Sequence, residues 1–222
     1  MSSSLAMRLV GIALVGAALC TGIASYLFWL TSEPQTVAAK PSAGRSADLT
    51  LQTVAALGQG YPAHPDWVSY LARRQNGRWV HSTNLTVPAH SLIRVTIRQY
   101  DTATGLRNPY FSQVQGTSGG TMQLDGRTVK AVSPSAPAHT FAIPQLGVYV
   151  PLPGVADDAP NQCSAAPCTE GEAHRTITFT FRTKGKGHFR WQCFVPCGAG
   201  YVTGFGGPMQ AFNYMSGYVT VA

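Results

Sequence analysis

The hydrophobic positions of the chain follow two patterns. From Leu9 to Leu30 the sequence LVGIALVGAALCTGIASYLFWL contains no charged residue. At a rise of about 1.5 Å per residue, a helix of this length spans a hydrocarbon core about 30 Å thick. After Trp79 the apolar residues instead recur at short intervals between turn-forming residues. The pattern therefore predicts one transmembrane helix followed by a set of β-strands.

Several short segments in the second half of the chain are predicted as strands. Thr176–Phe181 alternates hydroxyl and apolar side chains, as expected of a half-buried antiparallel strand. The turn residues Lys184–Gly187 separate it from His188–Cys193, and this arrangement predicts a hairpin. Leu92–Arg98 alternates only in part. Further strands are predicted at Thr121–Leu124 and Thr128–Val132, joined by a turn at Asp125-Gly126, and at Tyr218–Val221.

The composition supports an all-β domain. The 222 residues include 23 Gly and 15 Pro without a period, and 45% are hydrophobic, which rules out a disordered chain. Many short strands joined by turns predict an antiparallel sandwich or barrel and disfavour a helical bundle, a coiled coil or a TIM barrel. The net charge is +7, but the basic residues are scattered, so no nucleic-acid partner is expected.

The flanks of the apolar run predict its orientation in the membrane. Arg8 precedes the run and Glu33 is the first charge after it, so the positive-inside tendency places the N-terminus in the cytoplasm. A cleaved signal peptide is the alternative, although its apolar core is usually only about 7–15 residues long. Tyr26, Phe28 and Trp29 form an aromatic edge where the outer interface of an uncleaved anchor would lie.

We expect three parts in the chain. Residues 1–31 form a single-pass anchor in the cell membrane, residues 32–60 form a tether with a short helix around Ala47–Leu57, and residues 61–222 form an extracytoplasmic domain. Disulfides are permitted outside the cytoplasm. Cys163 and Cys168 lie in an Asp-, Asn- and Pro-rich stretch, and they are predicted to form a disulfide that closes a surface loop.

The residues that can carry chemistry are concentrated in a few stretches. Cys193 and Cys197 lie four residues apart at the end of a predicted strand, in a Gly- and Pro-rich loop. His139 begins another apolar strand upstream, and Met209 follows downstream. Imidazole, thiolate and thioether form the ligand set that suits copper in electron-transfer sites. The sequence has no nucleophile elbow, phosphate-binding glycine loop or pair of acid–base carboxylates, so hydrolase and transferase chemistry is not predicted.

Three motifs follow one another in the second half of the chain: His139-Thr-Phe-Ala-Ile-Pro-Gln-Leu-Gly-Val, Val150-Pro-Leu-Pro-Gly154 and Gln192-Cys-x-x-x-Cys-Gly198. In this order they resemble the cupredoxin domain of cytochrome c oxidase subunit II, over residues 88–222 and in the membrane anchor. The resemblance implies an all-β fold, a cupredoxin-like antiparallel β-sandwich preceded by one N-terminal transmembrane helix, and a dinuclear copper centre. It makes His139 an imidazole ligand, Cys193 and Cys197 the thiolates, and Val195 the source of a carbonyl ligand.

The sequence departs from this family pattern after the second cysteine. Tyr201 stands where the family has its second histidine, Gly204 stands where it has its methionine, and the next methionine is Met209. No histidine follows His188. Three possibilities stay open: a modified copper site of His139, Cys193, Cys197 and Met209, with His188 as a remote replacement; a Cys193–Cys197 disulfide without metal; or a site completed by a neighbouring subunit.

The resemblance implies an electron-transfer subunit of an oxidase-type membrane complex, which takes electrons from a donor cytochrome or cupredoxin and passes them to other subunits. Such a chain is itself non-catalytic, since no residues for dioxygen chemistry are visible. The alternative is a metal-free structural or accessory subunit of a membrane respiratory complex. Because the chain has only 9 Asp and Glu residues, a membrane-tethered or acidic donor is expected in place of a basic cytochrome.

Overall fold

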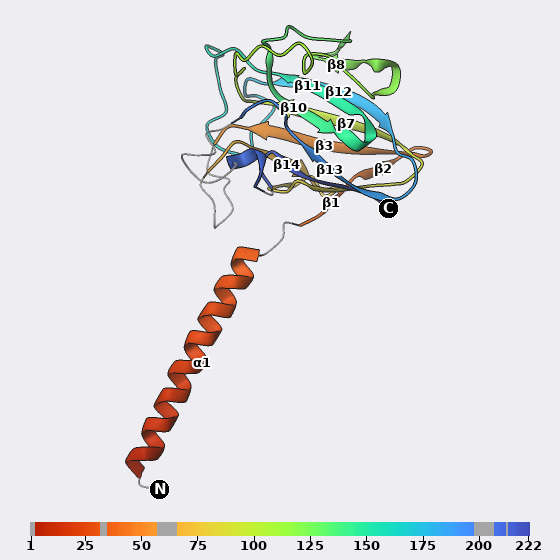
Figure 1. Ribbon diagram of the computed structural model, residues 1–222. Helices are drawn as coiled ribbons and strands as arrows, with labels where there is room; N and C mark the ends of the chain where they lie inside the picture. Colours follow the sequence, from red (N-terminus) through yellow and green to blue (C-terminus); the bar gives the residue numbers. More distant parts are fainter. Residues whose placement is uncertain (1–2, 32–34, 57–65, 198–206, 212) are drawn as a thin grey trace. The chain divides into compact units, whose positions relative to one another are not determined.

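The computed structural model describes residues 3–31, 35–56, 66–197, 207–211 and 213–222, which divide into a helical unit and a β-sheet unit (Figure 1). The helical unit is α1 (Ser3–Thr31). Its segment Leu5–Phe28 has a mean hydropathy of 1.9 and no buried residue, and it is long and apolar enough to cross a membrane. The predicted N-terminal apolar helix is therefore confirmed, although a signal sequence near the N-terminus can also pass this test of length and composition.

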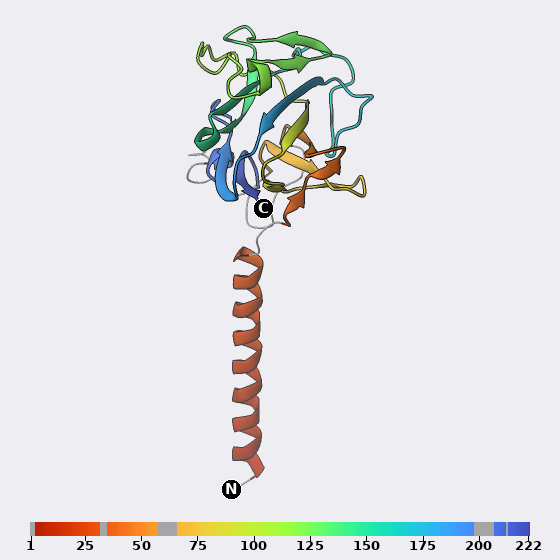
Figure 2. The same cartoon turned by 90° about the vertical axis from the view of Figure 1, so that its right-hand side faces the viewer.

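Two sheets pack face to face in the β-sheet unit (Figures 1 and 2). The six-stranded sheet has the order β1-β6-β14-β13-β10-β11. Its strands are β1 (Val37–Ala38), β6 (Asn84–Val87), β10 (Pro137–Ile143), β11 (Val148–Pro153), β13 (Gly187–Gln192) and β14 (Ser216–Val221). The predicted sandwich is thus confirmed, including its C-terminal strand.

The eight-stranded sheet has the order β5-β4-β3-β7-β12-β8-β9, and β2 pairs with β3 beside this path. Its strands are β2 (Lys40–Ser42), β3 (Ser46–Val54), β4 (Ser69–Arg73), β5 (Trp79–Val80), β7 (Leu92–Gln99), β8 (Met122–Leu124), β9 (Arg127–Val129) and β12 (Arg175–Arg182). Three single turns of 3₁₀ helix lie in the connections, namely η1 (Ser118–Gly120), η2 (Pro144–Leu146) and η3 (Gly207–Met209).

Among the described strands most pairs are antiparallel, as predicted, but three are parallel. These are β1 with β6, β6 with β14, and β3 with β7. A parallel pair needs a crossover connection, because its two strands run in the same direction. The sheets are therefore mixed, which the alternation of side chains alone does not reveal.

The segment predicted as a tether belongs instead to the sandwich. Residues 46–54 form β3, not a helix, and β3 pairs along its length with β7. Ala47, Leu49 and Leu51 point into the core at every second position, which is the period of a strand. The sandwich consequently begins at Val37 and not near Tyr61. The prediction failed because the strand carries few β-branched residues and its partner lies far along the chain.

The hairpin predicted from β12 and β13 is not formed. β12 pairs with β7 and β8 in one sheet, whereas β13 pairs with β14 and β10 in the other. The turn between them therefore leads from one sheet to the other, and Phe181 and Trp191 enter the core from opposite sheets. The predicted turn at Asp125-Gly126 does join β8 to β9, and both residues have the positive φ that a type I′ hairpin turn requires.

His81 provides a test of stability against pH. Its ring lies 5.1 Å from that of Tyr214, and its pKa falls to about 4, because burial outweighs a hydrogen bond with the backbone of Asn213. An unfolded histidine titrates near pH 6.5, so between about pH 6.5 and 4 the unfolded state binds a proton that the folded state does not. We expect the free energy of unfolding to fall by about 2–3 kcal/mol as the pH drops through this window.

Urea titrations of the full-length protein at pH 7 and pH 4.5 measure this loss. A His81→Gln variant should lose less stability on acidification than the unmodified protein does. The same substitution at the exposed His188 provides the matched control. Equal pH dependence in the His81→Gln variant and the unmodified protein would contradict the assignment.

Candidate metal centre

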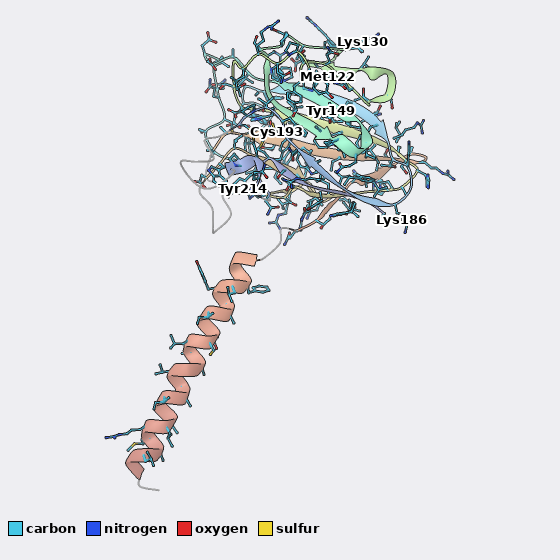
Figure 3. All side chains as sticks on the ribbon, in the orientation of Figure 1. Met122, Lys130, Tyr149, Lys186, Cys193 and Tyr214 are labelled. Atoms are coloured by element: carbon cyan, nitrogen blue, oxygen red, sulfur yellow. A yellow bond between two sulfur atoms is a disulfide. The ribbon has the colours of Figure 1, made fainter. Side chains whose placement is uncertain are left out.

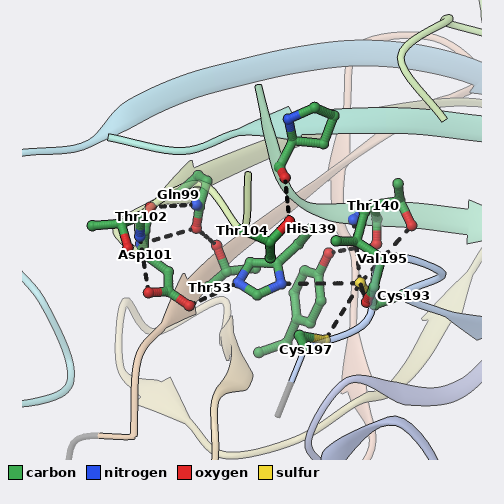
Figure 4. Close-up of polar contacts among 12 residues, drawn as sticks. Thr53, Gln99, Asp101, Thr102, Thr104, His139, Thr140, Cys193, Val195 and Cys197 are labelled. Carbon is green, nitrogen blue, oxygen red and sulfur yellow. Dashed lines mark hydrogen bonds and ion pairs between the residues drawn. The ribbon is translucent and has the colours of Figure 1, made fainter. Parts of the chain in front are cut away.

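Three soft ligand atoms converge at one end of the six-stranded sheet. Strands β10 and β13 are antiparallel, with Ala142 opposite Gln192, so the start of β10 lies beside the loop that follows β13. This pairing brings His139 Nδ1 to 3.9 Å from Cys193 Sγ, and Cys197 Sγ lies 3.6 Å from Cys193 Sγ (Figure 4). All three ligand atoms lie within 4.8 Å of one another, and all three residues are buried.

Backbone groups hold Cys193 in place. The Cys193 N–H donates to the carbonyl of Met215 at 2.8 Å, and the Cys193 sulfur accepts the N–H of Thr140 at 3.3 Å. The next residue, Phe194, donates its N–H to the Thr140 hydroxyl at 2.8 Å. The carbonyl of Val195 lies 3.4 Å from the Cys193 sulfur, so the residue expected to supply a carbonyl does bring it to the site. The loop is thereby fixed to the strands on both sides.

A carboxylate orients the imidazole. His139 Nε2 lies 3.1 Å from Asp101 Oδ2, which leaves Nδ1 facing the sulfurs (Figure 4). Asp101 follows β7, and its other oxygen accepts the N–H of Thr102 at 2.9 Å. Its own N–H donates to Gln99, a fully buried side chain that also accepts the Thr53 hydroxyl. The histidine ligands of metals commonly have such a partner on the second ring nitrogen.

A close approach of two chain segments positions the Asp101 loop. A Cβ at Gly154 would lie 2.2 Å from the backbone nitrogen of Ala103, so only glycine fits there. Beside it, the Val155 N–H donates to the Asp101 carbonyl at 3.1 Å. The end of β11 therefore supports the loop that carries the carboxylate.

The charges of the site are strongly coupled. Burial alone would lower the pKa of His139, but its hydrogen bonds with Asp101 and Cys193 raise it to about 9. Burial opposes ionisation of Cys193, yet hydrogen bonds with Cys197 and His139 bring its pKa well below the usual value. The hydrogen bond to Cys193 and burial raise the pKa of Cys197. These shifts favour a protonated His139 and an ionised Cys193 over a neutral pair, so binding of a metal at these groups would be coupled to proton release.

Two of the three separations between these atoms fit the ligands of a single metal ion. Bonds of about 2.0–2.3 Å to nitrogen and sulfur place neighbouring ligands of one ion about 3.5–4.0 Å apart. The separations of 3.9 Å and 3.6 Å fall in this range. A disulfide would require about 2.05 Å between the sulfurs, and Cys193 and Cys197 are instead free thiols. The predicted alternative of a Cys193–Cys197 disulfide is therefore not formed in this structure.

The other predicted ligands have different outcomes. Met209 lies in η3 and packs against the core, and its role as a ligand stays a prediction. His188 is exposed on β13, where its Nδ1 forms a 2.9 Å hydrogen bond with the Thr220 hydroxyl and its ring stacks on Tyr218. It therefore does not replace the missing imidazole. Tyr201 and Gly204 lie outside the described residues. The predicted Cys163–Cys168 disulfide is present.

A pocket gives access to the site. It has a volume of about 320 Å³, reaches His139 and Cys197, and is bordered by Asp66, Trp67 and Asp101. Cys197 forms part of its wall, whereas Cys193 does not line it. The pocket therefore reaches the site only at His139 and Cys197.

Sequence reasoning missed Asp101, Thr140 and Tyr70. The Tyr70 hydroxyl donates to the Thr140 carbonyl at 3.0 Å, and its pKa is well above the usual value because of burial and the nearby cysteines. Only one signal pointed to Asp101, namely an isolated acid directly after a strand in a chain poor in acids. The pairing with His139 spans many residues and could not be read from spacing.

Replacing Asp101 should weaken metal binding without unfolding the domain. In an Asp101→Asn variant the amide can still contact the ring, but the negative charge that supports the imidazole is lost. We expect a loss in copper affinity of about 10–100-fold, measured by competition with a chelator. The matched control is Asp125→Asn, which removes an exposed carboxylate paired with Arg175. Equal affinities for the two variants would contradict a role for Asp101.

Comparison with known proteins gives a distant similarity in structure. No family profile and no curated protein match the chain. A structure of the copper protein rusticyanin is 14% identical over 83% of this chain and 86% of its own, with a TM-score of 0.35. Rusticyanin from Thiobacillus ferrooxidans is 15% identical over 86% of this chain and 85% of its own, also with a TM-score of 0.35. The case for a metal centre therefore rests on the residues of this chain.

Proposed function

We propose that this protein is a membrane-anchored, cupredoxin-type electron-transfer protein that binds copper through His139, Cys193 and Cys197. The observation that carries the proposal is the convergence of one imidazole nitrogen and two sulfurs within 4.8 Å at a buried site. Thiolates select soft ions such as Cu(I), and imidazole also suits copper. Val195 is the candidate for a carbonyl ligand, and Met209 for a further sulfur ligand.

The surroundings of the site suit a carrier of single electrons. Bound copper supplies the change between its two oxidation states. The residues of the chain keep the ligands in fixed positions, through Asp101 on the imidazole and the backbone contacts of Cys193. Burial excludes water from the ligands, so little has to reorganise when the charge of the site changes.

The order of the three motifs supports a subunit II-like component of an oxidase-type complex as the particular role. In that role the apolar helix is a single-pass anchor with its N-terminus in the cytoplasm, and the sandwich is extracytoplasmic. Partners are then other subunits and a donor cytochrome or cupredoxin. The missing second imidazole favours one copper ion in place of a dinuclear centre, unless a neighbouring subunit supplies a ligand.

Metal analysis and spectroscopy of the full-length protein test the proposal. Purified in detergent and supplied with copper, the protein should retain about one ion per chain and show a visible thiolate-to-copper charge-transfer band in the oxidised form. A matched control replaces Cys20, the other free cysteine among the described residues, which lies in α1. Retention of no copper, together with a Cys193–Cys197 disulfide, would instead support the metal-free accessory subunit.

A further inference from the structure

A group of four aromatic rings connects the cysteine loop to the protein surface. We call it the aromatic patch, and it comprises Tyr110, Phe111, Tyr149 and Phe194. Phe194 directly follows Cys193, and its ring stacks on Phe111 with centroids 5.7 Å apart and lies 6.0 Å from Tyr149. Tyr110 contacts both Phe111 and Tyr149, at 5.3 Å and 5.7 Å. The patch thus extends from the metal centre to an exposed ring.

The outer edge of this patch is unusually exposed. In the described part of the sandwich, Leu106 and Tyr110 are the only large hydrophobic side chains that are strongly exposed, at 52% each. Both lie in the same loop, four residues apart. Large contiguous apolar patches on soluble domains commonly mark interaction sites.

The chain segments that carry the patch bear charges of one sign only. The sequence has no acidic residue in 102–124, 126–156 or 173–222, so the segments that carry the patch contribute no carboxylate. Arg107 lies in the loop between Leu106 and Tyr110, and Lys130 lies on a segment that pairs with residues next to Phe111; both are exposed. An acidic partner would therefore be attracted to this surface, and a basic one repelled.

The side of the site formed by the His139 imidazole is less suited to contact with a partner protein. The outward nitrogen of His139 is occupied by Asp101, and the ring is 1% exposed. The adjoining pocket is bordered by the carboxylates of Asp66 and Asp101. The aromatic patch is the surface that combines an apolar centre, a cationic rim and direct contact with the cysteine loop.

We propose that the aromatic patch is the docking surface for an acidic one-electron redox protein. This inference rests on the proposed electron-transfer function and adds the surface and the charge of the partner to it. The apolar rings would form the centre of the interface, and Arg107 and Lys130 would steer the partner and fix its orientation, as charges at a rim do.

Binding measurements on the full-length protein in micelles of a neutral detergent test this surface. The probes are a soluble c-type cytochrome with an acidic surface and one with a basic surface. We expect the acidic cytochrome to bind, with weaker binding at higher ionic strength, and the basic one not to bind. A variant with Arg107→Glu and Lys130→Glu should bind the acidic cytochrome about tenfold more weakly or worse. A Leu106→Ser and Tyr110→Ser variant should weaken binding by a similar factor at every salt concentration.

The matched control is a variant with Lys184→Glu and Lys186→Glu, which makes the same change in net charge. Both lysines are exposed in the turn between β12 and β13, and Figure 3 shows Lys186 at the lower edge of the sandwich and Lys130 at its upper edge. We expect this control to change the dissociation constant by less than about twofold. Equal effects of the two charge reversals, or no effect of either patch variant, would overturn the proposal.

A lipid surface is the competing occupant, since anionic headgroups also attract cations. Hydrogen exchange of the loop that holds Leu106 and Tyr110, measured in phosphatidylglycerol and phosphatidylcholine nanodiscs, separates the two. Slower exchange in phosphatidylglycerol, without protection by the acidic cytochrome, would overturn docking of a protein.

Binding of the acidic cytochrome is measured with and without copper, so that the docking surface and the proposed function are tested separately. If the protein cannot retain copper but still binds the acidic cytochrome through the patch, only the proposed function is contradicted. If it retains copper but the patch variants bind the acidic cytochrome as tightly as the unmodified protein does, only the docking surface is contradicted.

Discussion

Replacing Cys193 with serine is expected to remove both the charge-transfer band and tight copper binding. Cys193 is the central member of the site, since its sulfur approaches His139 Nδ1, the Cys197 sulfur and the Val195 carbonyl. A serine hydroxyl is not ionised at neutral pH and is a poor ligand for a soft ion. We expect a loss in copper affinity of more than about 100-fold. Removing a ligand should weaken binding more than replacing Asp101, which only supports the ligand His139.

Competition with a chelator and visible spectra of the full-length Cys193→Ser variant measure this loss. Cys20→Ser provides the control, since it removes a thiol of the same chemistry from α1. A fold check by circular dichroism separates loss of the ligand from loss of structure. Copper retained with an unchanged band in Cys193→Ser would show that the metal binds elsewhere.

The second large effect concerns stability and is expected at Trp191. This side chain is fully buried, lies 4.9 Å from the ring of Phe141 and 4.8 Å from that of Tyr70, and donates its Nε1–H to the Thr83 carbonyl at 2.8 Å. A Trp191→Ala variant leaves a cavity between the two sheets and should lower the free energy of unfolding by about 3–5 kcal/mol.

Urea denaturation of the full-length Trp191→Ala variant gives the magnitude. Trp191→Phe keeps most of the volume and should cost less, although it leaves the Thr83 carbonyl without this donor. The control is Trp79→Ala, because Trp79 is only half-buried and contacts Arg73 at the surface of β5. If Trp191→Ala and Trp79→Ala lost equal stability, the packed core described for Trp191 would be wrong.

Local patterns predicted much of the secondary structure. The uncharged run of α1, the alternation in β12 and the Asp125-Gly126 turn depend on residues that are close in sequence, and each prediction is confirmed. The parallel pairing of β3 with β7 and the separation of β12 from β13 into different sheets depend on partners far away along the chain. These two features are the ones that sequence reasoning got wrong.

The residues of the candidate site likewise divide into those that the sequence revealed and those that it did not. His139, Cys193 and Cys197 were found because imidazole and thiols are rare in this sequence and have few structural uses. Asp101 was not found, since a single carboxylate after a strand has many possible roles and its partner is thirty-eight positions away. The thiol state of Cys193 and Cys197 could not be predicted either, because it depends on a distance between sulfurs that only the folded loop defines.

The position of β14 has a consequence for the order of assembly. This last strand lies in the interior of its sheet, between β6 and β13, and the Met215 carbonyl just before it holds the backbone of Cys193. The sheet is therefore incomplete until β14 has been synthesised and has inserted between strands made much earlier. The candidate metal centre is accordingly complete only after the whole sandwich has been translated and has folded.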